Sequence, residues 1–124
     1  MHRYILCAAA LLAASAVSDA ADSDSNYLIR GIGQSSCHSY NKARAADSDS
    51  YGHYINGYLT AYNAFAPDTY DITPGMDGDA IIAWMDSYCA DKQTSSIADA
   101  MSHLVEEMHE KREKTSHGGG ARWP

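Results

Sequence analysis

Two stretches of the chain carry residue types that bind metal ions. In the run 103–110, His103 and Glu107 share one helix face at i,i+4, whereas His109 points elsewhere, so three ligands do not converge. The carboxylates of the segment 68–79 lack both the alternating D-x-D-x-D-G pattern and the distal glutamate of a calcium loop. A solvated acidic surface explains the run 103–110, and we expect no metal ion and no cofactor.

A thiol and a base stand side by side at Cys37 and His38, a pairing that can activate a cysteine nucleophile. A disulfide at Cys37 would remove that nucleophile. The chain also lacks the G-x-S-x-G, glycine-rich phosphate-loop and H-E-x-x-H motifs. Because no set of acid, base and nucleophile converges, the sequence predicts that the protein is not an enzyme.

Residues 1–20 have the layout of a secretory signal peptide. Residues 1–3 carry positive charge, residues 4–14 are uncharged and apolar, and Ser18 and Ala20 fit positions −3 and −1 of a cleavage site. About eleven apolar residues are too few to span a bilayer. The sequence therefore predicts a periplasmic or secreted protein that has no membrane contact after the signal is removed.

Signal removal would take Cys7 away and leave Cys37 and Cys89. An even pair of cysteines in an exported protein is most simply one disulfide, with two buried free thiols as the alternative. On the chain-entropy model, closing a loop of this length stabilises the fold by about 4 kcal/mol. So short a domain has a total stability on the order of 5 kcal/mol, so the bridge would be decisive.

The length and charge of the chain exclude several classes of function. With 124 residues it forms one small domain at most, too short for a (β/α)₈ barrel or a two-domain dinucleotide enzyme. Sixteen Asp and Glu against nine Lys and Arg give a net charge of −7, which argues against nucleic acid as a partner. At pH 2–3 most carboxylates are neutral, and the net charge without residues 1–20 becomes roughly +13. This change permits activation by acid, because self-repulsion opposes compactness.

Apolar spacing and capping residues predict four short helices and negligible strand. An extended lead-in covers 21–34, where two glycines oppose helix formation. A first helix, capped by Ser35 or Ser36, runs to about Ala46. Residues 115–124, which include three consecutive glycines, are expected to form a flexible tail.

The second helix gives the clearest signal, an apolar stripe at helical spacing between 51 and 65. The run 47–50 supplies its cap and Pro67 ends it, while Gly57 lies away from the stripe and suggests a close approach of another helix. The stripe consists of Tyr51, Tyr54, Ile55, Tyr58, Leu59, Tyr62 and Phe65. A ten-residue loop, 67–76, follows.

Two further helices complete a helical domain at 35–114. The third begins at Asp77 or Asp79, where negative charge suits the positive end of the helix dipole, and the fourth is capped by Thr94 or Ser95. Their apolar faces consist of Ile81, Trp84, Met85, Tyr88 and Cys89 in the third and Ile97, Met101, Leu104, Val105 and Met108 in the fourth. The predicted fold is an all-α bundle of about four short helices, with one disulfide between the first and third.

Four pieces of sequence resemble the HdeA family, namely Ser36-Cys37-x-x-Tyr40, Gly57-Tyr58-Leu59-x-x-Tyr62-Asn63, Ala80-Ile81 leading to Cys89, and a final helix from Ser95. Members of that family are small periplasmic helical proteins with one disulfide. They are known as acid-stress chaperones that dimerise near neutral pH and bind unfolding clients as monomers in acid. The resemblance implies a protein-binding module that shields unfolding periplasmic proteins, with a possible homodimer at rest.

The same interpretation places client binding on the aromatic and apolar side chains of the second and third helices. The expected client or interface residues are Tyr54, Ile55, Tyr58, Leu59, Tyr62, Phe65, Trp84 and Met85. A distant similarity to small exported immunity proteins, which pair with type VI secretion effectors, offers a second function. The chain would then neutralise one basic effector at neutral pH through its acidic fourth helix or the loop 67–76.

Overall fold

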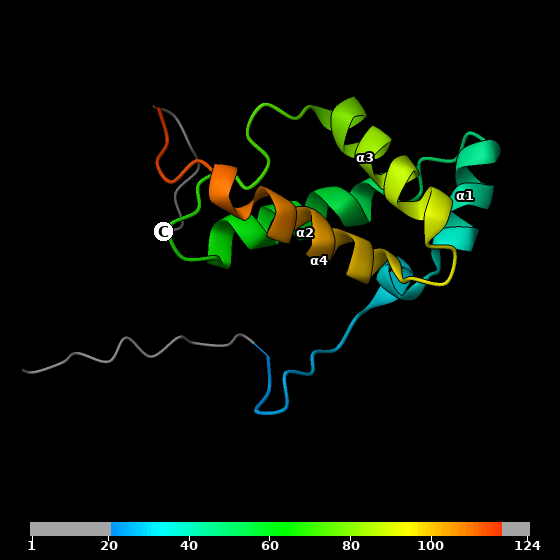
Figure 1. The fold of residues 1–124 in the computed structure, drawn as a ribbon, viewed down its shortest axis with the longest axis horizontal. Helices are drawn as coiled ribbons and strands as arrows, with labels where there is room; N and C mark the ends of the chain where they lie inside the picture. Colours follow the sequence, from blue (N-terminus) through cyan, green and yellow to red (C-terminus); the bar gives the residue numbers. More distant parts are fainter. Residues whose placement is uncertain (1–20, 118–124) are drawn as a thin grey trace, which may run out of the picture.

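The computed structural model describes residues 21–117, and Figure 1 shows them as a bundle of helices joined by loops. The α-helices are α1 (Cys37–Ala45), α2 (Gly52–Phe65), α3 (Gly78–Asp91) and α4 (Ile97–Met108), and the 3₁₀ turns are η1 (Gly31–Gln34) and η2 (His109–Lys111). Apart from two isolated β-bridges, the described part of the chain has no β-structure. The predicted all-α fold is therefore confirmed. The expected signal peptide and most of the tail, 118–124, lie outside the described residues.

Local capping bonds explain where three of the helices begin. Ser36 and Asp77 each accept a hydrogen bond from the backbone N–H three residues later, so both of these predicted caps are confirmed. The cap of α4 is Ser96, whose side chain accepts from the N–H of Asp99 while the Asp99 carboxylate accepts from the N–H of Ser96. The cap expected at 94 or 95 is therefore one or two residues too early.

Two expectations about α2 are wrong. The run 47–50 does not cap this helix, because the residue before its first turn is Tyr51, which makes no side-chain capping bond and is buried instead. Gly57 is exposed and nothing lies within 4 Å of the position that a Cβ would occupy, so no helix approaches it closely. Gly57 lies on the solvent side because the opposite side of α2, with Ile55 and Leu59, faces the core.

The lead-in expected to be extended over 21–34 ends in the helical turn η1. Gly31 has φ of +60°, a conformation that glycine adopts without steric cost. Gly33 is buried, and a Cβ at that position would overlap the ring of Tyr54. The two glycines therefore permit a tight turn packed against α2, in addition to preventing a longer helix.

The hydrophobic core consists of inward-facing side chains from all four helices and of one loop residue. The predicted apolar face of α4 is confirmed, since its members Ile97, Met101, Leu104, Val105 and Met108 are all buried. Ile72, in the loop 67–76, is also fully buried, and its N–H donates to Oδ1 of Asn63 at 2.8 Å. Phe65 departs from the predicted stripe because it is the last residue of α2, and its side chain is 78% exposed.

Backbone pairing holds the two ends of the bundle. At one end the starts of α1 and α4 lie side by side, with the N–H of Cys37 bonded to the carbonyl of Ser95 at 2.8 Å. At the other end the chain after η2 runs beside the loop 67–76, where the N–H of Glu113 donates to the carbonyl of Asp71 at 2.8 Å. Between residues 21 and 117, no helix has the length and apolar character needed to cross a membrane.

Candidate functional site

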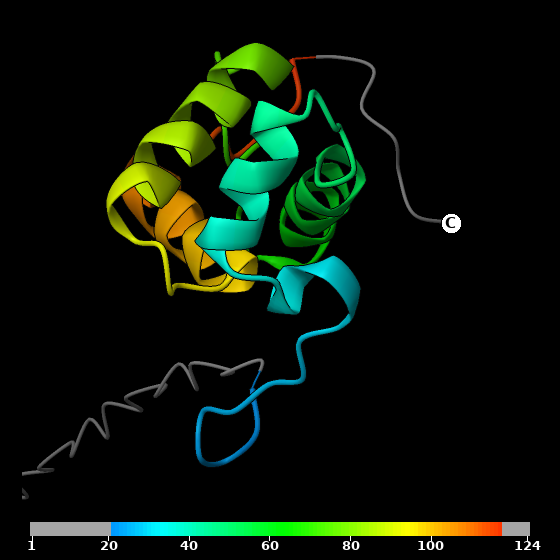
Figure 2. The same ribbon diagram turned by 90° about the vertical axis from the view of Figure 1, so that its right-hand side faces the viewer.

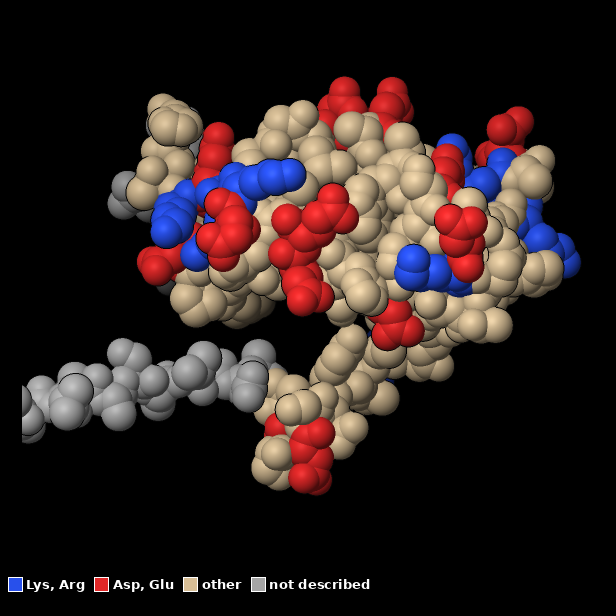
Figure 3. Space-filling view, viewed as in Figure 1, with Lys and Arg blue, Asp and Glu red and all other residues tan. Residues whose placement is uncertain are grey.

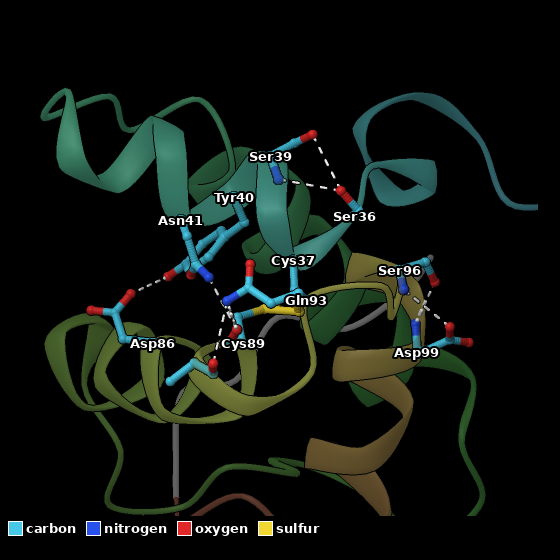
Figure 4. Close-up of a disulfide and its surroundings, with 11 residues drawn as sticks. Ser36, Cys37, Ser39, Tyr40, Asn41, Asp86, Cys89, Gln93, Ser96 and Asp99 are labelled. Carbon is cyan, nitrogen blue, oxygen red and sulfur yellow. Dashed lines mark hydrogen bonds between the residues drawn. A yellow bond between two sulfur atoms is a disulfide. The ribbon is translucent and has the colours of Figure 1, made fainter.

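A disulfide joins α1 to α3. The sulfur atoms of Cys37 and Cys89 are 2.08 Å apart, and both side chains are fully buried. Figure 2 shows α1 lying between α2 and α3, and Figure 4 shows the bond where the start of α1 meets the end of α3. The predicted bridge between the first and third helices is confirmed, and it removes Cys37 as a nucleophile.

One turn along α1 from the disulfide, Tyr40 connects three helices. Its side chain is fully buried, and its hydroxyl donates to Oδ1 of Asp86 in α3 at 2.7 Å (Figure 4). Its ring packs edge-to-face on Tyr51 at the start of α2, with the ring centroids 5.2 Å apart. The Asp86 carboxylate also accepts from Nε and Nη2 of Arg44 at 3.0 and 3.1 Å. We call Tyr40, Arg44, Tyr51 and Asp86 the three-helix junction.

The carboxyl group of Asp86 makes the three-helix junction sensitive to acid. Partial burial raises the pKa of Asp86, but the hydrogen bonds from Arg44 and Tyr40 and the Arg44 charge outweigh burial, so the pKa lies below its ordinary value of 3.8. Burial, followed by the bond to Asp86, raises the pKa of Tyr40, so its hydroxyl stays protonated and donating. The stabilisation from Asp86 is complete above pH 3.8 and is lost as the pH falls through the lowered, folded-state value.

Asp86→Asn is expected to lower the free energy of unfolding at pH 7 and to have a progressively smaller effect as the pH falls below 3.8. At neutral pH the substitution removes the ion pair with Arg44, whereas in acid the wild-type ion pair is itself lost as the Asp86 carboxylate takes up a proton. Because both side chains are 42% exposed, the ion pair is worth ~0.5–1 kcal/mol. Urea unfolding from pH 7 to pH 2 measures the difference between the two proteins.

The control for this substitution is Asp91→Asn, which changes an exposed carboxylate in the last turn of the same helix. It is expected to alter the free energy of unfolding by less than about 0.5 kcal/mol at every pH. A difference between wild type and Asp86→Asn that stays constant down to pH 2 contradicts the role given to the Asp86 charge.

The eight expected client residues differ in exposure. Three are buried in the core, namely Ile55, Leu59 and Met85. Four are partly buried at the surface of the bundle, namely Tyr54, Tyr58, Tyr62 and Trp84, and Phe65 is exposed. The folded domain therefore offers a partner only the five at the surface, and the other three become accessible only if the helices separate.

A shared serine holds one of the partly buried tyrosines in place. The hydroxyl of Tyr58 lies 3.3 Å from Oγ of Ser102 in α4, and Ser102 itself donates to the carbonyl of Ala98 at 3.0 Å. The hydroxyl of Tyr27, in the segment before η1, lies 3.4 Å from the same Oγ. Ser102 thus connects α2, α4 and the N-terminal segment on one side of the bundle.

The sequence analysis did not identify the contact that joins Tyr40, Arg44 and Asp86. Helical periodicity does not signal a polar contact between two helices. One signal was nevertheless available: Tyr40 lies three residues after Cys37, and Asp86 lies three residues before Cys89. Once the cysteines are paired, these spacings bring positions 40 and 86 to the same side of the bond.

Within 21–117, no three or more His, Cys, Asp or Glu side chains are placed so that they could hold a metal ion. No family model, curated protein or solved structure matches the chain. Geometry and charge are therefore the basis for the function proposed below.

Proposed function

We propose that the protein is an exported acid-stress chaperone of the HdeA type, which binds unfolding proteins when the surrounding pH falls. The observation that carries this proposal is the three-helix junction. The helices α1, α2 and α3 meet at buried Tyr40, whose hydroxyl is held by the Asp86 carboxylate. Acid neutralises that carboxylate and removes its ion pair with Arg44, while the Cys37–Cys89 bond keeps α1 attached to α3.

The overall charge of the chain also favours loosening of the helix packing in acid. Among residues 21–117, Arg44 and Asp86 form the only close pair between a carboxylate and a Lys or Arg. Most carboxylates are therefore neutralised by acid without releasing a bound cation, and the chain becomes strongly positive. Self-repulsion then favours an expanded state that keeps its helices but loosens their packing.

Loosening at the three-helix junction would make the buried client residues accessible. Ile55 and Leu59 lie on the inward side of α2, and Met85 precedes Asp86 in α3. An unfolding client also exposes apolar surface, and contact between the two surfaces removes both from water. The disulfide limits the extent of opening, so the helices can repack when the pH returns to neutral.

Light scattering by an acid-labile client protein at pH 2–3 tests this function. The purified protein with its disulfide intact is expected to suppress aggregation at an equimolar ratio and to give no protection at pH 7. Phe65→Ser, which changes an exposed client residue, is expected to reduce the protection. Tyr70→Ser, at an exposed aromatic of the loop 67–76, is the matched control. Absence of protection in acid overturns the proposal.

A second function is favoured by the acidic outer surface of α4. Glu106 and Glu107 are exposed, and Figure 3 shows Asp and Glu side chains gathered over this helix, with Lys and Arg toward the two ends of the molecule. Such a surface favours fast, salt-sensitive association with a basic protein at neutral pH, as expected of an immunity-type protein. Stoichiometric recovery of one basic protein at pH 7, lost on changing both glutamates to Gln, supports this function.

A further inference from the structure

A groove between α3 and α4 combines aromatic rings with carboxylates. Its volume is about 400 Å³, and it is lined by Trp84, Tyr88, Lys92, His103, Glu106 and Glu107. The first three follow one another at i,i+4 spacing along α3 and its C-terminal cap, and the others come from α4. We call these six residues the α3–α4 groove.

The α3–α4 groove contains a stacked pair of aromatic rings. Trp84 and Tyr88 are nearly parallel, with centroids 5.3 Å apart and an angle of 18° between the planes. His103 lies against Tyr88 with a centroid distance of 5.4 Å. The ammonium nitrogen of Lys92 lies 4.8 Å from the centre of the Tyr88 ring. The chain itself therefore places a cation against this stack, an arrangement that the ring quadrupole favours.

Carboxylates lie beside the same rings. The indole Nε1 of Trp84 donates to Oε2 of Glu107 at 3.1 Å, which fixes this carboxylate near the stack. Glu106, one residue earlier, is exposed and lines the same groove. A planar guanidinium can stack on an aromatic ring while it donates paired hydrogen bonds to a carboxylate. An ammonium group provides the charge but not the planar stacking.

We propose that the α3–α4 groove binds an arginine side chain of a protein partner at neutral pH. This inference deepens the second function, on which it rests, by naming the binding site and the chemistry of the group it takes. Charge complementarity favours this occupant, since the groove is lined by two glutamates and one lysine and the chain carries a net charge of −7. Lys92 is exposed and acts as an internal competitor, which the arginine displaces from the Tyr88 ring.

Titration with a blocked Gly-Arg-Gly peptide at pH 7 and low salt tests the inference. Trp123→Phe leaves Trp84 as the single indole, because the chain has two tryptophans, and the NMR signal of its Nε1–H reports binding. The arginine peptide is expected to shift this signal saturably. The peptide with citrulline in place of arginine keeps the shape without the charge and is expected to bind about 10-fold more weakly.

Two variants are expected to move the affinity in opposite directions. Glu106→Gln combined with Glu107→Gln weakens binding by roughly 3–10-fold, because the carboxylates that pair with the guanidinium are lost. Lys92→Ala strengthens binding by about 3-fold, because the internal competitor is removed. Lys42→Ala, at an exposed lysine of α1, makes the same charge change away from the groove and is the control.

The possible outcomes distinguish failure of the groove assignment from failure of the second function. Equal affinity for the arginine and citrulline peptides overturns the assignment, as does unchanged affinity in the glutamine double variant. An affinity for Lys92→Ala no higher than that of the control overturns the competitor role of Lys92. If the peptide binds as expected but no basic protein is recovered at pH 7, the groove assignment stands and the second function fails.

Discussion

Replacing both cysteines with alanine (Cys37→Ala and Cys89→Ala) is expected to lower the free energy of unfolding by about 4 kcal/mol. The bond joins residues 52 positions apart, so its loss greatly increases the freedom of the unfolded chain. Both side chains are fully buried, and the alanines leave a small void that adds to the loss. Because so short a domain has a stability on the order of 5 kcal/mol, the variant should lie close to its unfolding midpoint at 25 °C.

Urea unfolding followed by far-UV circular dichroism at pH 7 measures this loss. Wild-type protein is expected to unfold in one cooperative transition, whereas the double variant is expected to be partly unfolded before urea is added. Reduction of the wild type, which breaks the bond without deleting atoms from the core, is the matched control and should give a similar loss. A decrease smaller than about 1 kcal/mol in both cases contradicts the structural importance of the bond.

The position of the disulfide also explains why the proposed acid response can be reversible. It lies one turn of α1 from Tyr40, and it joins the same two helices that share the Asp86–Arg44 ion pair. Acid can therefore remove the ionic contact between α1 and α3 but not the covalent one. We expect the reduced protein to unfold in acid and so to lose its protective effect, because no covalent bond then keeps α1 beside α3.

The parts of the fold that depend on local spacing could be predicted from the sequence. Ser36 and Asp77 were identifiable as caps because an N-cap bond spans only three residues. The buried face of α4 was identifiable because its apolar residues repeat with the helical period. The same period extended the α2 stripe to Phe65, where it fails because the helix ends at that residue.

Contacts between segments distant in sequence could not be predicted in this way. The close packing of Gly33 on Tyr54 and the bond from Tyr40 to Asp86 depend on how helices are placed, which no repeat in the sequence encodes. For the same reason, the sequence does not show that three of the eight expected client residues are buried in the folded domain. Periodicity finds the apolar side of a helix but does not distinguish a core surface from a binding surface.

The loop 67–76 contains the clearest example of a contact that could not be predicted from the sequence. Ile72 is an isolated apolar residue among Asp, Thr, Pro and Gly, a composition typical of a solvent-exposed turn. Its side chain is nevertheless fully buried in the hydrophobic core. The backbone beside it is fixed on two sides, by Asn63 of α2 and by the pairing of Asp71 with Glu113.

Ile72→Ala is expected to lower the free energy of unfolding by about 3 kcal/mol. The loss should not fall at the low end of the range for buried isoleucines, because the fixed backbone prevents the loop from collapsing into the space. Ile72→Val removes one methylene and is expected to cost ~1 kcal/mol, while Tyr70→Ala, at an exposed neighbour, should cost less than about 0.5 kcal/mol. Urea unfolding at pH 7 measures all three variants. Equal stability of Ile72→Ala and Tyr70→Ala would mean that the loop does not pack on the core, and that α2 and the end of α4 are held together without it.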